Sequence, residues 1–159
     1  MRKAEINRKT RETDINIKIE LNETGADGKP FKNASGVLPG AQIKKIVTVK
    51  NVSDNACWVR LAVNKAISLA EGVSTAPDLS LVSLDINRED WCERDGFYYY
   101  KHPLEAGQTT VPLFTTVSFD TAMDDSYKRG TAEITVRAQA VQYANNGASA
   151  LNAVGWREE

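Results

Sequence analysis

The feature that most constrains this fold is an alternation of apolar and polar side chains with a period of two. Residues 131–143 read TAEITVRAQAVQY, so that Ala132, Ile134 and Val136 alternate with threonines, a glutamate and an arginine. This pattern is typical of a strand with one face on a core and the other in water. The alternation slips at Val141, which predicts a bulge or bend there.

The same period recurs along the chain. Residues 13–21 (TDINIKIEL) alternate cleanly, and further strands are expected at residues 42–51, 56–63, 79–86, 97–100 and 109–119. The turn-forming residues 51–55 (NVSDN) between the second and third of these strands predict a hairpin. Pro112 predicts an edge or a bulge in its strand, because proline cannot donate to a ladder.

Helical character is limited to short segments. Residues 64–76 are ambiguous, with a short helix or an irregular excursion around 65–71, and residues 121–130 and 148–154 leave room for single helical turns. Residues 22–40 and 87–96 have the composition of loops. The expected fold is therefore all-β: an antiparallel β-sandwich with short helical excursions.

The length of 159 residues suits one domain. We divide the chain into an N-terminal arm (1–12), a sandwich domain (13–145) and a C-terminal segment (146–159). The arm reads MRKAEINRKTRE and has no apolar stretch of the kind a signal peptide needs. It is expected to be solvated or to dock on another subunit.

Composition excludes several classes of function. The 20 Lys and Arg residues balance 21 Asp and Glu, which argues against nucleic acid as a partner. No apolar run is long enough for a membrane span. The single histidine, His102, and the absence of HExxH, P-loop and GxSxG motifs favour a protein that is not an enzyme and needs no metal or cofactor.

The two cysteines leave alternatives open. A disulfide between Cys57 and Cys92 would close a loop of about 35 residues and contribute about 4 kcal/mol in the chain-entropy model. The alternative is two separate thiols, with Cys57 buried in its strand and Cys92 exposed in a loop. A catalytic pair of Cys92 with His102 has no evident third group to orient it.

Two further sets of side chains are weak candidates for sites. Acidic residues in two loops could offer oxygen ligands to Ca²⁺, although solvated loops are the more common outcome. The aromatic run 97–100 could present rings to a glycan or a peptide, or could simply belong to the core. The calcium candidates are Asp90, Asp95, Asp124 and Asp125, and the candidates for ligand binding are Trp91, Tyr98 and Tyr100.

The strand at residues 13–21 is the best candidate for a mechanism. A strand that follows an arm can complete its own sheet or the sheet of a neighbouring copy, since main-chain hydrogen bonds supply the affinity in both cases. Head-to-tail exchange of this kind does not close on itself and produces filaments. The expected docking side chains are Ile15, Ile17, Ile19 and Leu21.

Two resemblances to known families add to these expectations. Residues 2–25 (RKAEINRKTRETDINIKIELNETG) resemble the opening strand of imidazoleglycerol-phosphate dehydratases, whose chemistry requires repeated histidine clusters. With one histidine, this chain does not have those clusters. The likeness therefore extends to a strand and not to the activity.

The second resemblance spans residues 36–156. The segments VLPGAQIKKIVTVKNVSDNACWVRLAV, DGFYYYKHPLEAGQTTVPLFTTVSFD and MDDSYKRGTAEITVRAQAVQYANN resemble exported Gram-positive proteins of the TasA and camelysin type, whose leaders are cut by a SipW-like signal peptidase. The resemblance implies a jelly-roll-like β-sandwich, a cell-surface or extracellular location and a role as a fibre subunit of a biofilm matrix. The expected partners are further copies or other matrix and cell-wall proteins. The protease activity described for camelysin is not expected, because HExxH and a second histidine are absent.

Overall fold

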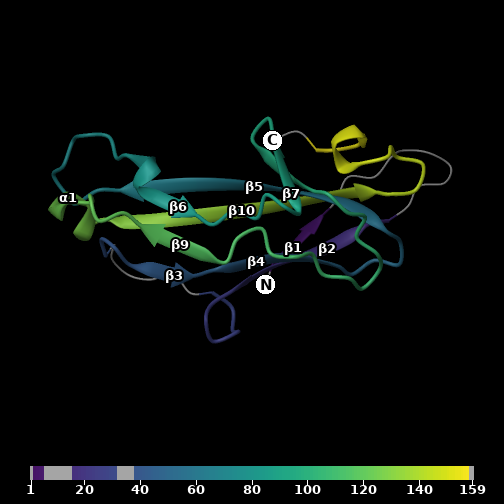
Figure 1. Ribbon diagram of the computed structural model, residues 1–159, viewed down its shortest axis with the longest axis horizontal. Helices are drawn as coiled ribbons and strands as arrows, with labels where there is room; N and C mark the ends of the chain where they lie inside the picture. The colour runs from purple at the N-terminus through teal and green to yellow at the C-terminus, as the bar shows by residue number, and fades with distance from the viewer. Residues whose placement is uncertain (1, 6–15, 32–37, 158–159) are drawn as a thin grey trace.

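The computed structural model describes residues 2–5, 16–31 and 38–157, and it is built of antiparallel sheets packed as a sandwich (Figure 1). The helical elements are α1 (Asp125–Lys128) and the 3₁₀ turns η1 (Leu79–Leu81) and η2 (Ala150–Asn152). The strands are β1 (Arg2–Glu5), β2 (Lys18–Thr24), β3 (Gln42–Lys44), β4 (Ile46–Asn51), β5 (Cys57–Ser68), β6 (Val82–Leu84), β7 (Trp91–Arg94), β8 (Phe97–Tyr100), β9 (Thr116–Phe119) and β10 (Thr131–Gln142). The sandwich and the short helical turns near 125 and 150 confirm the expectation from sequence.

One layer is a four-stranded sheet in the order β10-β5-β8-β7. Strands β5 and β10 pair along their whole lengths, from Cys57 opposite Gln142 to Ser68 opposite Thr131. They are the long central ribbons of Figure 1. Gly130, just before β10, lies very close to the end of β5. A Cβ at this position would be 2.2 Å from the Ser68 carbonyl oxygen.

The second layer joins two three-stranded sheets, β1-β2-β4 and β3-β9-β6. Strands β3 and β4 are one extended segment interrupted at Lys45, so each sheet continues into the other. The segment before β9 runs along the other edge of β4, where the Leu113 N–H donates to the Val47 carbonyl oxygen and the Val47 N–H donates to Phe114. Pro112 lies where regular pairing is interrupted, and only residues 116–119 of the strand expected at 109–119 form β9.

Asp85 ties the far edge of this layer together. Its carboxylate accepts hydrogen bonds from the Thr115 N–H, the Thr115 hydroxyl and the Thr116 N–H, each at 2.8 Å. Partial burial raises the pKa of Asp85. The hydrogen bonds from Thr115 and Thr116 together lower the pKa by more than burial raises it, so the pKa lies below its usual value. The ionised carboxylate therefore links the end of β6 to the start of β9.

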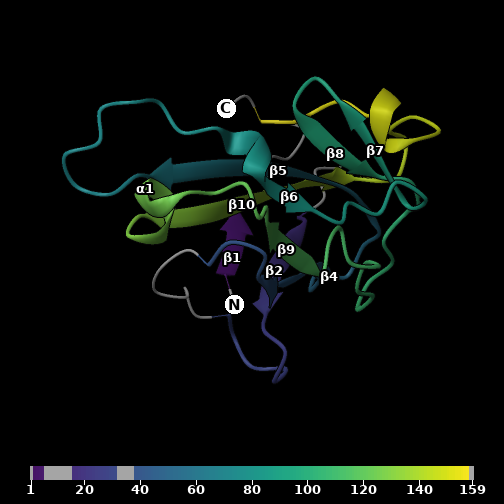
Figure 2. The same ribbon diagram turned by 60° about the vertical axis from the view of Figure 1, so that its left-hand side comes forward.

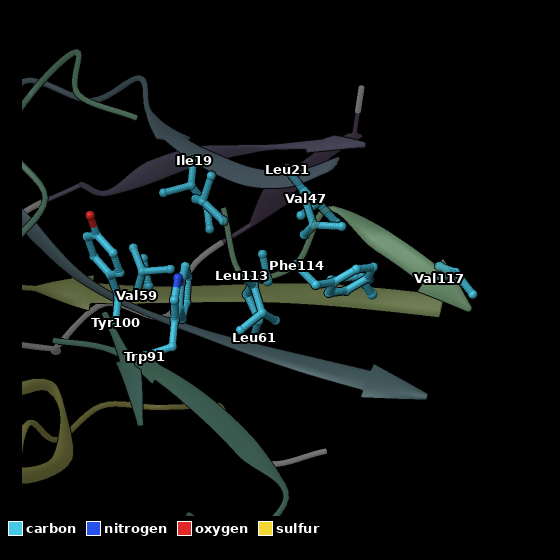
Figure 3. Packing of buried hydrophobic residues seen from close by; sticks show 14 of the residues in the cluster. Ile19, Leu21, Val47, Val59, Leu61, Trp91, Tyr100, Leu113, Phe114 and Val117 are labelled. Carbon is cyan, nitrogen blue, oxygen red and sulfur yellow. The ribbon is translucent and has the colours of Figure 1, made fainter. Parts of the chain in front are cut away.

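The main core lies between the two layers (Figure 3). Ile19 and Leu21 of β2 meet Val59 and Leu61 of β5, and Trp91 of β7 closes one side. All five side chains are at most 1% exposed. The alternation read from sequence therefore assigns the inward faces of β2, β4 and β5 correctly.

A second, smaller cluster covers the outer face of the β10-β5-β8-β7 sheet. Trp58, Tyr99 and Val141 lie there under Ala150 and Ala153 of the C-terminal segment. Figure 2 shows this segment, in yellow, beside β7 and β8. The cluster corrects the bulge expected at Val141: the ladder continues to Gln142, and Val141 is apolar because the C-terminal segment covers it.

Two other expectations about local structure were wrong, and the ambiguous residues 64–76 begin as strand. Residues 51–55 do not form a hairpin, because β4 pairs with β2 and β5 pairs with β10 and β8. They form a corner between layers, held by the Asn51 side-chain amide, which donates to the carbonyl oxygens of Asn55 at 2.8 Å and Leu104 at 2.9 Å. Residues 65–68 continue β5 instead of turning into a helix, and the expected loop 87–96 contains β7.

The first residues of the expected N-terminal arm form a strand. β1 pairs with β2 from Arg2 opposite Leu21 to Glu5 opposite Lys18. The strand expected at 13–21 is observed as β2 over residues 18–24, because its last residues extend the pairing with β4 as far as Thr24 opposite Ile46.

None of the helical elements in the described part of the chain has the length and apolar character of a membrane span.

Candidate functional site

The first candidate site is the place of β2 between β1 and β4. Ladders hold β2 on both edges, and its inward side chains complete the core. Ile17 is 3% exposed, and Ile19 and Leu21 are each 1% exposed. The fourth docking residue expected from sequence, Ile15, lies outside the described residues. The structure thus brings three of the four together in the chain's own core.

A buried ion pair fixes β2 from the side. Lys45 is only 4% exposed, and its Nζ lies 3.3 Å from Oε1 of Glu23 on β2. The same Nζ donates to the Ile134 carbonyl oxygen of β10 at 2.8 Å and lies 4.6 Å from the centre of the Phe31 ring. One ammonium group therefore connects β2, the β3–β4 junction and the opposite sheet.

Sequence reasoning missed Lys45, although a signal was present. Ile43, Val47 and Val49 were assigned to the inward face of their strand, and Lys45 occupies the same phase between them. A charged residue at an inward position of a strand requires a partner, because an unpaired buried charge is costly. Glu23 supplies that partner.

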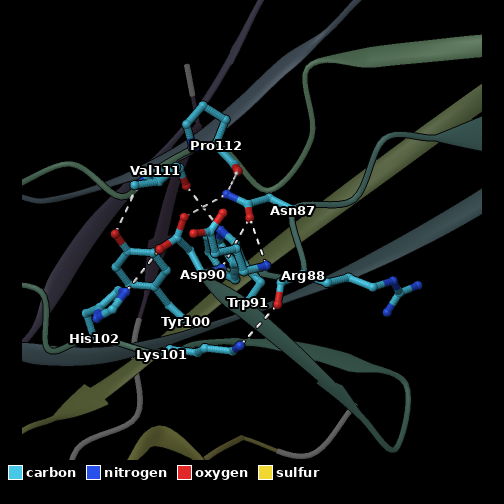
Figure 4. A network of polar contacts seen from close by, with 10 residues as sticks. Asn87, Arg88, Asp90, Trp91, Tyr100, Lys101, His102, Val111 and Pro112 are labelled. Atoms are coloured by element: carbon cyan, nitrogen blue, oxygen red, sulfur yellow. Dashed lines mark hydrogen bonds and ion pairs between the residues drawn. The ribbon is translucent and has the colours of Figure 1, made fainter.

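The aromatic residues proposed as a ligand surface are not on the surface. Trp91 is 1% exposed and Tyr100 is 6% exposed, and their rings pack against each other in the core with centroids 4.8 Å apart. The Trp91 indole N–H donates to the Val111 carbonyl oxygen, and the Val111 N–H donates to the Tyr100 hydroxyl, both at 3.1 Å (Figure 4). Tyr98 is half-buried against the same core. The alternation along β8 holds, but these rings occupy its inward side.

The same region contains a polar network around Asp90 (Figure 4). Its carboxylate accepts a hydrogen bond from the Asn87 side-chain amide at 2.9 Å and lies 3.1 Å from Nε2 of His102. The hydrogen bond from Asn87, and then that from His102, lower the pKa of Asp90. His102 therefore partners Asp90, as a tie between the loops that flank β7 and β8.

The other calcium candidates also have local partners. Asp124 caps α1 by accepting from the Ser126 N–H at 3.0 Å, and hydrogen bonds from Ser126 lower its pKa. Asp125 lies 3.4 Å from the Lys128 ammonium, and Asp95 lies 4.0 Å from the Arg94 guanidinium. In the part of the chain that the structure describes, no three acidic, histidine or cysteine side chains gather in a way that could hold a metal ion.

The two cysteines are free thiols. Cys57 belongs to the main core, whereas Cys92 pairs with Tyr99, whose ring lies on the outer face of the same sheet. Because directly opposite residues of an antiparallel pair share a face, the two thiols point to opposite sides of the sheet and cannot be bridged in this arrangement. Burial raises the pKa of the Cys57 thiol to about 12. Cys92 is half-buried within β7, not exposed in a loop as expected.

A second site that sequence reasoning missed is centred on Arg60, on the outer face of β5. Its guanidinium stacks on Phe97 at 3.7 Å and on Trp156 at 4.8 Å from the ring centres. It donates to Gln139 Oε1 at 2.9 Å, to the Tyr99 hydroxyl at 3.0 Å and to the Arg157 carbonyl oxygen at 2.7 Å. Arg60 is 7% exposed, so the C-terminal segment encloses a cation in an aromatic and polar setting.

Comparison with models of protein families, with curated proteins and with solved structures gives no match to this chain.

Proposed function

We propose that the protein is a non-enzymatic structural subunit whose copies assemble by exchanging the β1–β2 hairpin at a cell surface or in an extracellular matrix. The observation that supports this most is the position of β2. It has ladder partners on both edges and inward side chains at most 3% exposed, yet residues 25–41 separate it from β3. A strand held in this way can leave with its hairpin and be replaced by the same strand of another copy.

Exchange would preserve the contacts that hold the hairpin. A hairpin from a second copy would pair with β4 in the same register, with Ile19 and Leu21 in the same core positions. The connection of residues 25–41 between β2 and β3 is long enough, when extended, to carry the hairpin to a neighbouring copy. Because the donor and the acceptor surfaces differ, the contact is heterologous and leads to open filaments.

The ion pair between Lys45 and Glu23 would give the exchange its register. A strand shifted by one residue would turn its apolar side chains to water and leave the Lys45 ammonium without the Glu23 carboxylate. The proposal therefore requires an incoming strand with both the apolar alternation and the carboxylate. A copy of this chain meets both conditions.

The resemblance of residues 36–156 to TasA- and camelysin-type proteins supports the proposed location and the role in a matrix. The alternative proposed from sequence, a binding module with exposed aromatic rings, has less support because Trp91 and Tyr100 belong to the core.

A reversible lock on the hairpin tests the proposal. Glu20 of β2 lies directly opposite Lys50 of β4, so Glu20→Cys with Lys50→Cys can form a disulfide across this ladder. The pair is introduced with Cys92→Ser and oxidised at low concentration, where each chain closes on itself. Assembly is then followed by light scattering and negative-stain microscopy across concentrations.

We expect the wild-type chain and the reduced variant to form open oligomers or filaments, and the oxidised variant to stay monomeric. The reduced variant is the matched control, because it differs only in the disulfide. Filaments from the oxidised variant, or a wild-type chain that remains monomeric at every concentration, would contradict the proposal.

A further inference from the structure

The described part of the C-terminal segment, residues 146–157, is bonded within itself. The side chain of Asn146, which is 3% exposed, accepts from the Val154 N–H at 2.9 Å and donates to the Val154 carbonyl oxygen at 3.0 Å. The η2 turn lies between these two residues. The segment is therefore held partly by its own hydrogen bonds, and Asn146 also donates to the Gln142 carbonyl oxygen of β10 at 2.8 Å. Such internal bonding lowers the entropic cost of docking.

Besides its apolar contacts with the segment, the sheet holds the main chain of this segment by hydrogen bonds. The Trp58 indole N–H donates to the carbonyl oxygen of Asn146 at 3.1 Å. The Arg94 guanidinium donates to the carbonyl oxygen of Leu151 at 3.0 Å, and the Arg60 guanidinium donates to that of Arg157. These three donors, from β5 and β7, are spaced along the whole segment. The outer face of the β10-β5-β8-β7 sheet is thus built as a receptor for a peptide segment.

Trp156 is the aromatic anchor of the segment, but its buried indole N–H lacks a hydrogen-bond partner within the described part of the chain. Its ring packs edge-on against Tyr99, with centroids 5.8 Å apart, and lies over Arg60. Among the described residues, Trp58 and Trp91 both donate their indole N–H to a carbonyl oxygen, whereas the buried Nε1 of Trp156 has no hydrogen-bond partner. An unpaired buried donor weakens the contact that carries it.

The turn that connects β10 to the segment uses left-handed backbone at two positions. Asn145 has a φ of 53° and Gly147 a φ of 81°, and a Cβ at Gly147 would meet the Asn152 carbonyl oxygen at 3.0 Å. This turn is the hinge at which the segment would leave its own sheet, and exchange of an identical terminal element is a low-cost route to association between copies.

We propose that the outer face of the β10-β5-β8-β7 sheet binds residues 146–157 of a second copy of the chain, in place of the chain's own segment. The docked segment would make the same three main-chain hydrogen bonds and seat its Trp156 on Arg60. This contact uses another face of the sandwich and another part of the chain than the hairpin exchange. It goes beyond the proposed function and does not depend on it.

A labelled peptide measures this binding directly. The probe is a fluorescein-labelled synthetic peptide of residues 143–157, titrated by anisotropy with full-length chains. In the wild-type chain the attached segment competes at a high effective concentration. In Trp156→Ala the attached segment loses its anchor and the receptor becomes accessible. The matched control is Val154→Ala, which changes a side chain in the same segment that is 58% exposed.

We expect Trp156→Ala to bind the peptide at least tenfold more tightly than the wild-type chain or Val154→Ala. A peptide with Trp156→Ala should bind at least tenfold more weakly than the native peptide. Absence of saturable binding to a folded Trp156→Ala chain would overturn the proposal. If that variant does not fold, Trp156→Leu is used with the same expected and contradicting results.

Displacement tests whether a whole second copy can donate the segment. Unlabelled full-length Arg60→Met has an intact segment and an impaired receptor, and it should displace the peptide from Trp156→Ala. The double variant Arg60→Met/Trp156→Ala should not. Since all chains carry the same β1–β2 hairpin, hairpin exchange contributes equally and cannot produce the difference. A peptide that binds but is not displaced by Arg60→Met would overturn donation by a second copy.

Discussion

Replacing Lys45 by methionine tests how strongly the buried ion pair holds β2. The substitution keeps an unbranched apolar stem and removes the ammonium group. It abolishes the contact with Glu23, the hydrogen bond to the Ile134 carbonyl oxygen and the stacking on Phe31. Glu23, whose side chain is 18% exposed, then loses its contact with the Lys45 ammonium.

The magnitude follows from the burial of the two partners. The side chain of Lys45 is 5% exposed and that of Glu23 is 18% exposed. Removing one partner of a fully buried pair costs about 3–5 kcal/mol, and residual access of Glu23 to water reduces this to about 2–3 kcal/mol. Replacing both residues, as Lys45→Met with Glu23→Gln, should cost less than the sum of the single changes by about 1–2 kcal/mol, because each single change already removes the contact between the two side chains.

The assay is urea unfolding at neutral pH, in which a shift of the midpoint at constant slope reports the free energy of unfolding. Lys44→Met is the matched control, because Lys44 is the neighbouring lysine but is exposed. It should change the stability by no more than about 0.5 kcal/mol. If Lys45→Met were no more destabilising than Lys44→Met, or if the two single changes were additive, the ion pair would not hold β2 as we infer.

Three further predictions concern other parts of the sandwich. Asp85→Asn should cost about 1–3 kcal/mol at neutral pH, because an amide cannot accept all three hydrogen bonds. As the pKa of Asp85 is lowered in the folded chain, its contribution is present above the unfolded pKa and is lost as the pH falls through the folded value, so urea midpoints of the two chains should converge in acid. Gly130→Ala should cost more than about 1 kcal/mol in thermal unfolding, because the new Cβ meets backbone at 2.2 Å, whereas at Gly25 the nearest atom is 3.5 Å away and the change should be tolerated. A thiol reagent should modify Cys92 in the folded chain and Cys57, which is fully buried, only after unfolding; equal rates would contradict the assigned faces.

The sequence predicted which side chains face the core because alternation is a local property of a strand. The inward assignment of Ile19, Leu21, Val59 and Leu61 was correct for that reason. Strand partners were harder to predict, because a period of two specifies a face and not a neighbour. Residues 51–55 have the composition of a hairpin turn, yet the two flanking strands enter different layers.

The errors at Val141 and in the aromatic run have different causes. In the aromatic run the alternation is correct but the face is wrong, because Tyr98 and Tyr100 face the main core. Val141 lies on the outer face of the β10-β5-β8-β7 sheet, which the C-terminal segment covers. Local patterning cannot reveal this cover, so an apolar residue on that face is interpreted as a slip in phase. The inward position of Lys45 was visible in the sequence, but its partner Glu23 could be assigned only once β2 was placed beside β4.

The central claim is that the β1–β2 hairpin of one copy completes the sheet of another, and the partner of β2 within assembled material tests it most directly. Glu20→Cys with Lys50→Cys, in the Cys92→Ser background, is kept reduced during assembly and oxidised afterwards. A control pair, Ala66→Cys with Glu133→Cys, lies directly opposite across β5 and β10, which stay together in one chain. On a non-reducing gel the account predicts a ladder of linked chains for the first pair and a monomer band for the control. A monomer band for the first pair, after oxidation is complete, would contradict it.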